Sequence, residues 1–197
     1  MNRITRIVLT VFTSALLGGC ARSAELIRTA GIGECQDVFV TQAEGQPLPP
    51  GYAELRIVSL LKTHKPGLYS SADAHGTPGY KLLLNIGGQA LELSGDPRPE
   101  RKEPVGPRDP EAGDGMRYQF SRTLHVKAGT HRTVMAIPDD VIAVEKEIPL
   151  AEGSRNTLVL EPVYGKMPVR SRPWNYNVTD FNEGIRSLRV VFNGKEK

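Results

Sequence analysis

Two histidines and an aspartate occur in a short stretch whose residue types could bind a metal ion. His64 is followed by Asp73 and His75, and an Asp-x-His pair places two ligand groups on one side of an extended chain. The spacing matches no established zinc motif, and Lys65 next to His64 would repel a cation. We therefore interpret these three residues as polar members of a loop, and we expect no metal site.

The other two histidines, His125 and His131, bracket a turn between two expected strands. They could face each other across a hairpin, and Glu145 and Glu147 on the next strand could complete a general-base arrangement. No Gly-x-Ser-x-Gly or His-Glu-x-x-His motif occurs in the chain, so nothing identifies a nucleophile or a zinc-dependent hydrolase. We expect no catalytic residues, no cofactor and no enzyme activity.

Acidic side chains gather in two further places where calcium could bind. They are Asp139 and Asp140 after Pro138, and Asp109, Glu111 and Asp114 in a long polar segment. Neither place has the alternating order of oxygen ligands that organises a calcium loop. Acidic residues in turns are usually solvated, and we interpret both groups in that way.

One connection near the C-terminus combines aromatic and basic residues. It contains Arg170, Arg172, Trp174 and Tyr176. Aromatic rings stack on sugars and guanidinium groups bind hydroxyls, so this segment is a candidate binding site for carbohydrate or peptidoglycan. Two alternatives stay open: the aromatic pair plugs one end of the fold, which we favour, or it contributes to a protein interface.

The N-terminus has the three parts of an export signal. Arg3 and Arg6 precede an uncharged apolar segment, residues 7–17, which is shorter than the roughly 20 residues of a membrane-spanning helix. Leu17-Gly18-Gly19-Cys20 follows and resembles the lipobox of bacterial lipoproteins. The resemblance implies that residues 1–19 are a signal peptide, that Cys20 carries a diacylglycerol and an amide-linked acyl chain such as palmitate, and that Ala21 directs the protein to the outer membrane.

The composition of the chain excludes some further functions and structural classes. Removing Arg3 and Arg6 with the signal peptide lowers the formal charge from +3 to +1, so the mature chain has no basic excess for nucleic acid. Acylation of Cys20 would leave Cys35 as the remaining thiol of two, which excludes an intramolecular disulfide. The 15 prolines and 20 glycines are spread along the chain and favour many turns over long helices.

Short apolar runs separated by turn residues predict an all-β fold, an antiparallel β-sandwich of about eight or nine strands. We expect residues 20–50 to be a tether with one short strand at 37–41, and residues 51–197 to be one domain with an exposed loop at 94–115. Gly87-Gly88 between two apolar runs predicts a hairpin. At most one short helix is expected, a turn within 179–185.

The run from Leu124 to Val134, after Leu83 to Gln89, is similar to PEGA-type β-sandwich domains of bacterial envelope lipoproteins. This resemblance covers residues 52–164 and implies a prealbumin-like or immunoglobulin-like sandwich without known catalytic residues. We therefore predict a non-enzymatic structural or protein-interaction module of the cell envelope. Its expected partners are the membrane, through the lipid on Cys20, and an envelope protein or glycan.

Overall fold

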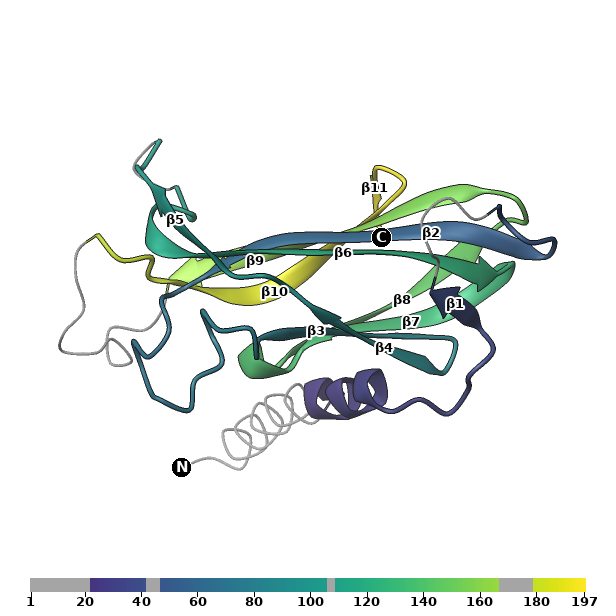
Figure 1. The fold of residues 1–197 in the computed structure, drawn as a ribbon, viewed down its shortest axis with the longest axis horizontal. Helices are drawn as coiled ribbons and strands as arrows, with labels where there is room; N and C mark the ends of the chain where they lie inside the picture. Colours follow the sequence, from purple (N-terminus) through teal and green to yellow (C-terminus); the bar gives the residue numbers. More distant parts are fainter. Residues whose placement is uncertain (1–21, 42–46, 106–108, 167–178) are drawn as a thin grey trace, which may run out of the picture.

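Alternating apolar and polar residues along the longest strands give the molecule two layers. The computed structural model describes residues 22–41, 47–105, 109–166 and 179–197. Two β-sheets lie face to face in these ranges (Figure 1). This confirms the predicted all-β sandwich.

The larger sheet has seven strands in the order β1-β6-β2-β9-β10-β11, with β5 also paired to β6. All neighbours are antiparallel except β2 and β9, which run parallel. The strands are β1 (Phe39–Thr41), β2 (Tyr52–Thr63), β5 (Arg98–Lys102), β6 (Gly113–Lys127), β9 (Arg155–Lys166), β10 (Glu183–Phe192) and β11 (Lys195–Glu196).

The smaller sheet has four antiparallel strands in the order β4-β3-β7-β8. They are β3 (Lys81–Ile86), β4 (Gln89–Ser94), β7 (Gly129–Ile137) and β8 (Ile142–Leu150), and a 3-10 turn, η1 (Pro138–Asp140), joins the last two. Gly87 and Gly88 connect β3 to β4 with φ values of 57° and 95°. The predicted hairpin is therefore confirmed, because glycine adopts positive φ without steric cost.

The core lies between the two sheets. Leu55 and Ile57 of β2 point inward from the larger sheet, and Leu82 and Leu84 of β3 belong to the same buried cluster from the smaller one. Alternate residues of β2 are more exposed, as the two-residue period of a strand requires. Burial of these aliphatic side chains contributes most of the stability of such a fold.

The predicted exposed loop at 94–115 is wrong in its middle and at its end. Residues Arg98–Lys102 form β5, which pairs with the start of β6, and β6 itself begins at Gly113. Apolar burial does not hold β5, whose side chains are exposed or half-buried. Backbone hydrogen bonds to β6 and an ion pair of Glu100 with Arg117, at 2.7 Å, hold it instead.

A helix at residues 22–31 lies in the segment that we expected to be a tether. Leu26 and Ala30 are buried against Val134 and Ala136 of β7, so the helix packs on the outer face of the smaller sheet (Figure 1). A spacing of four residues puts two side chains on one helix face. The short strand expected at 37–41 is present as β1.

The helical turn expected within residues 179–185 is absent. Residues from Glu183 onward belong to β10 and pair with the end of β9. Thr179 could cap a helix by type, but its carbonyl accepts a hydrogen bond from the backbone of Asp114. Pairing with β6 and β9 therefore replaces the local helical alternative.

The helices described in the structure are all too short or too polar to span a membrane.

Candidate metal centre

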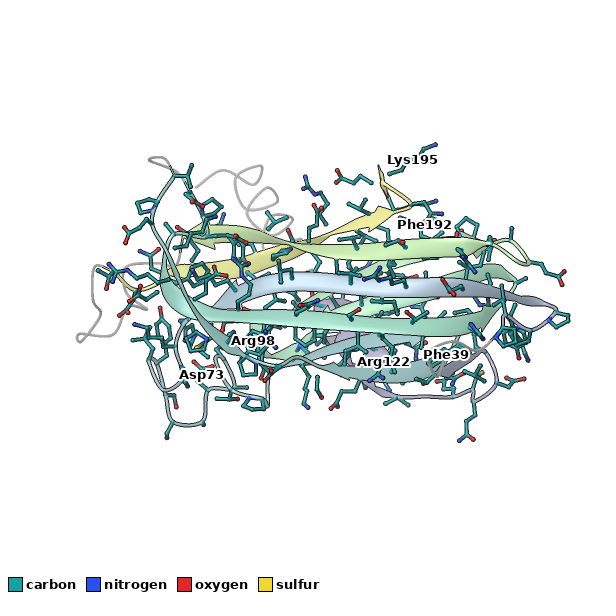
Figure 2. The ribbon with its side chains drawn as sticks, turned by 45° about the horizontal axis from the view of Figure 1, so that its top comes forward. Phe39, Asp73, Arg98, Arg122, Phe192 and Lys195 are labelled. Atoms are coloured by element: carbon teal, nitrogen blue, oxygen red, sulfur yellow. The ribbon has the colours of Figure 1, made fainter. Side chains whose placement is uncertain are left out.

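The connection between β2 and β3, residues 64–80, brings three potential metal ligands together at one end of the sandwich. Figure 2 shows Asp73 at this end, opposite Phe39 of β1. His64 follows the last residue of β2 directly, and the hydroxyl of Thr63 accepts a hydrogen bond from the backbone of Gly76 at 3.1 Å. This bond folds the connection back, so that His75 returns to the side of His64.

Gly76 is required for this close return. Its φ is 75°, and a Cβ atom there would lie 2.5 Å from the backbone nitrogen of Pro66. Any other residue would be strained and would collide with backbone. The glycine thus allows a sequence separation of eleven residues between two imidazole rings whose centroids are 4.6 Å apart.

The carboxylate of Asp73 lies between the two histidines. Its Oδ2 atom is 3.3 Å from Nε2 of His64, and its Oδ1 atom is 2.5 Å from Nδ1 of His75. One potential ligand atom from each of the three residues lies within 4.8 Å of the others. The three side chains are mostly buried, so the structure assembles a group that spacing alone did not indicate.

The other nitrogen of each imidazole faces a fixed hydrogen-bond acceptor. Nδ1 of His64 lies 3.0 Å from the backbone oxygen of Lys65, and Nε2 of His75 lies 3.3 Å from Oδ1 of Asp140 in η1. The second oxygen of Asp140 accepts a hydrogen bond from the hydroxyl of Tyr80. Both rings are thereby oriented with one nitrogen toward Asp73.

The two histidines differ in charge. Burial lowers the pKa of His64 and favours its neutral form. Burial would also lower the pKa of His75, but hydrogen bonds and charges from Asp140 and Asp73 outweigh it and raise that pKa to about 9. Burial opposes ionisation of Asp73, yet its bonds to His75 keep its pKa below the ordinary value. His75 is therefore a cation between two carboxylates at neutral pH.

A small cavity adjoins the two imidazoles. It has a volume of about 70 Å³ and is lined by His64, His75 and Asp140 together with Lys62 and Glu183. A water molecule takes roughly 30 Å³ in the liquid, so the cavity has room for about two. The cluster therefore borders polar space that water can occupy.

Lys65, which we expected to repel a cation at His64, is paired with two carboxylates. Its ammonium group lies 2.9 Å from Asp180 and 3.4 Å from Asp114, and the bond to Asp180 helps to raise its pKa. Two carboxylates thus offset the charge of Lys65. The objection that this lysine would repel a cation at His64 is correspondingly weakened.

A second group of charges surrounds the buried Lys62. Its ammonium donates hydrogen bonds to the backbone oxygens of Glu111 and Gly113, at 3.0 and 2.6 Å, and lies 3.3 Å from Glu100. Arg117 binds both Glu100 and Glu111. This group joins β2, β5 and β6, and it includes Glu111, one of the carboxylates that we considered as calcium ligands.

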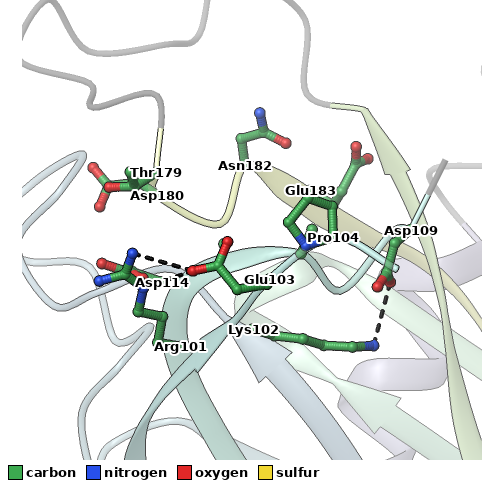
Figure 3. Close-up of a pocket in the computed structure, with 12 residues that line it drawn as sticks. Arg101, Lys102, Glu103, Pro104, Asp109, Asp114, Thr179, Asp180, Asn182 and Glu183 are labelled. Carbon is green, nitrogen blue, oxygen red and sulfur yellow. Dashed lines mark hydrogen bonds and ion pairs between the residues drawn. The ribbon is translucent and has the colours of Figure 1, made fainter. Parts of the chain in front are cut away.

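A larger hollow of about 250 Å³ lies between β5 and the start of β10 (Figure 3). Its basic residues are paired: Arg101 lies 3.1 Å from Glu103, and Lys102 lies 3.3 Å from Asp109. The Arg101–Glu103 pair is exposed and contributes little energy of its own. We assign no ligand to this hollow.

The general-base arrangement considered from the sequence does not form. His125 is buried on β6 of the larger sheet, whereas His131 lies on β7 of the smaller one. His131 is opposite Ile148 in register, and Glu147 is exposed beside that buried residue. His131 and Glu147 therefore point to opposite faces of their sheet.

Several predicted site residues lie outside the described residues. These are Cys20, the predicted lipidation site, and Arg170, Arg172, Trp174 and Tyr176, the predicted carbohydrate site. Both assignments stay predictions. Cys35 is described and is an exposed free thiol.

Sequence reasoning missed two members of the cluster, Tyr80 and Asp140. We interpreted Asp140 as a solvated turn residue, but it contacts His75 and Tyr80. The sequence Pro138-Asp139-Asp140 indicated only a turn, because its partner, the ring of His75, lies 65 residues away from Asp140.

No family model, curated protein or solved structure matches the chain.

Proposed function

We propose that the protein is a lipid-anchored lipoprotein of the cell envelope whose sandwich acts as a non-enzymatic interaction module. The lipobox at Leu17 to Cys20 supports the anchor, and the position of the N-terminal helix supports the arrangement at the membrane. Only Ala21 separates Cys20 from the first described residue, Arg22. Successive Cα atoms are 3.8 Å apart, so the lipid-bearing residue lies within about 8 Å of the helix.

This short separation supports an orientation in which the smaller sheet is near the membrane. The helix packs on the outer face of the smaller sheet through Leu26 and Ala30. A lipid on Cys20 would hold this side close to the headgroups, in the outer membrane as Ala21 suggests. The outer face of the larger sheet would then point away from the bilayer and be accessible to a partner.

The composition of that outer face fits a non-obligate protein interface. Leu60 on β2 and Val163 on β9 are 51% and 42% exposed, and Val58 and Val159 are adjacent in register. An ion pair between Arg189 and Glu161 lies beside them. A non-obligate interface is about as apolar as the rest of a protein surface and has a polar rim, and a face of exposed aliphatic residues beside an ion pair fits that description.

The anchor is tested by intact mass and detergent partitioning of the protein expressed in bacteria, beside a Cys20→Ala variant. We expect the wild type to gain the mass of a diacylglyceryl group and to enter the detergent phase, and the variant to do neither. A wild type that is secreted without lipid would contradict the proposal.

The interaction face is tested by photocrosslinking in living bacteria with a reactive amino acid at position 60. Position 105 is the matched control, because Val105 is also an exposed aliphatic residue but lies outside the sheet. We expect a discrete crosslinked product from position 60, lost when Val163→Asp is added, and none from position 105. Equal products from both positions would contradict a specific face.

A further inference from the structure

We propose that His64, Asp73 and His75 bind one divalent transition-metal ion, with Zn²⁺ as the best match. The ligand atoms are Nε2 of His64, Nδ1 of His75 and a carboxylate oxygen of Asp73. This inference concerns the loop end of the sandwich and is independent of the lipid anchor. Four observations support it: the contact of His64 with Asp73, the partners of the far nitrogens, the spacing of the ligand atoms, and the adjoining cavity.

The contact between His64 and Asp73 has the geometry of two ligands facing one ion. The backbone oxygen of Lys65 lies 3.0 Å from Nδ1 of His64 and can only accept a hydrogen bond, so Nδ1 carries a proton. Nε2, the other nitrogen of this ring, faces Oδ2 of Asp73 at 3.3 Å. A cation placed between this nitrogen and this oxygen would bind both.

The far nitrogens of both rings have the partners that metal-binding histidines usually have. A ligating histidine typically donates its other N–H to a backbone carbonyl or a carboxylate. His64 does so to Lys65, and Nε2 of His75 faces Asp140, which Tyr80 holds in turn. These partners fix the rings with Nε2 of His64 and Nδ1 of His75 toward Asp73.

The spacing of the ligand atoms suits a tetrahedral ion after one adjustment. Bonds of about 2.0–2.1 Å place tetrahedral ligands roughly 3.3 Å apart, which is the distance from His64 Nε2 to Asp73 Oδ2. The proton on Nδ1 of His75 now bridges to Asp73 at 2.5 Å. Metal binding would release that proton to solvent, form a metal–nitrogen bond, and lengthen this contact.

A cavity of about 70 Å³ adjoins the two imidazoles. It has room for a water molecule, which is the fourth ligand in zinc sites with three protein ligands. The donor set contains two imidazoles and one carboxylate. Imidazole suits zinc and related transition metals, whereas calcium and magnesium prefer oxygen ligands throughout.

The test uses the full-length chain in detergent, freed of metal by a chelator and titrated with Zn²⁺ against a chromophoric competitor. We expect one equivalent to bind tightly. His64→Ala and Asp73→Asn should each weaken binding by at least about 100-fold, because loss of an orienting partner alone costs about 10- to 100-fold. His131→Ala is the matched control and should bind as the wild type does.

A second measurement decides the matter even where a variant fails to fold. X-ray absorption on the zinc-loaded wild type should show two imidazoles bound to the metal, and Co²⁺ should give the visible absorption of a tetrahedral site. Absence of stoichiometric Zn²⁺ binding, fewer than two imidazoles on the metal, or equal loss in His131→Ala would overturn the proposal. Lipidation is irrelevant to each readout, so Cys20→Ala should bind zinc normally.

Discussion

Nε2 of His75 lies 3.3 Å from Oδ1 of Asp140, although the two residues are 65 positions apart in the sequence. His75 comes from the connection that follows β2, and Asp140 comes from the turn between β7 and β8. Their contact therefore ties an otherwise irregular loop of one sheet to a turn of the other. It also fixes the orientation of a ring that has a second carboxylate, Asp73, on its other side.

The Tyr80→Phe variant tests whether the hydroxyl of Tyr80 holds Asp140 in its contact with His75. The Tyr80 side chain is buried and its hydroxyl donates to Asp140. Its removal leaves a charged acceptor with one partner fewer, which we expect to lower the free energy of unfolding by about 1–3 kcal/mol in urea denaturation.

Tyr118→Phe is the matched control for Tyr80→Phe, since the Tyr118 hydroxyl donates to the backbone oxygen of Thr77 instead. We expect a similar loss of stability there but unchanged zinc affinity, whereas Tyr80→Phe should weaken zinc binding. Equal zinc affinities in the two variants would separate Asp140 from the metal site.

Local sequence patterns were sufficient to predict most of the sandwich. Nine of the strands coincide with apolar runs that turn residues separate, and Gly87-Gly88 marked its hairpin correctly. β5 was missed because it is held by backbone pairing and by the Glu100–Arg117 ion pair. Such interactions leave no apolar period in the sequence.

The metal cluster was harder to predict, for a different reason. The residue types of His64, Asp73 and His75 indicated possible metal ligands. Whether these side chains lie close together, however, depends on the fold of a connection with no regular structure. Gly76 and Thr63 make that fold, and Asp140 completes it from a distant turn. Spacing rules describe ligands on helices, strands and known loops, and they do not extend to this arrangement.

Gly76→Ala should disrupt the loop through backbone strain and through a collision with Pro66. Gly67→Ala should show the effect of backbone strain by itself. Both glycines have positive φ, 75° and 72°, but an added Cβ is blocked by Pro66 at position 76 and meets nothing within 4 Å at position 67. We expect Gly67→Ala to cost about 1–2 kcal/mol of backbone strain and Gly76→Ala clearly more. Urea denaturation measures both; equal losses would show that the contact with Pro66 is relieved by movement of the loop.

Acid should destabilise the protein through Glu100. Hydrogen bonds from Arg117, supported by Lys62, lower the pKa of Glu100 from 4.5 to about 2 despite its partial burial. A lowered pKa means that the folded state favours the ionised form. This stability is present above pH 4.5 and is lost as the pH falls toward 2.

We therefore expect the Glu100→Gln variant to be less stable than the wild type at pH 6, and the difference to shrink between pH 4.5 and 2. Thermal unfolding across this range measures it. Glu92→Gln is the control, because the exposed Glu92 carboxylate pairs with Lys81 at the surface and such pairs contribute little. A constant difference for Glu100→Gln across the range would show that its ionisation is not linked to folding.

Two leucines distinguish the core between the sheets from the outer face of the larger sheet. Leu84 of β3 is fully buried in the core, while Leu60 of β2 is 51% exposed on the outer face. Leu84→Ala removes buried methyl groups and leaves a cavity, so we expect a loss of about 2–5 kcal/mol in the free energy of unfolding. Leu60→Ala should lose less than about 1 kcal/mol. If Leu60→Ala proved as costly as Leu84→Ala, the outer face would be packed against something in the isolated protein and would not be the free surface that we propose for a partner.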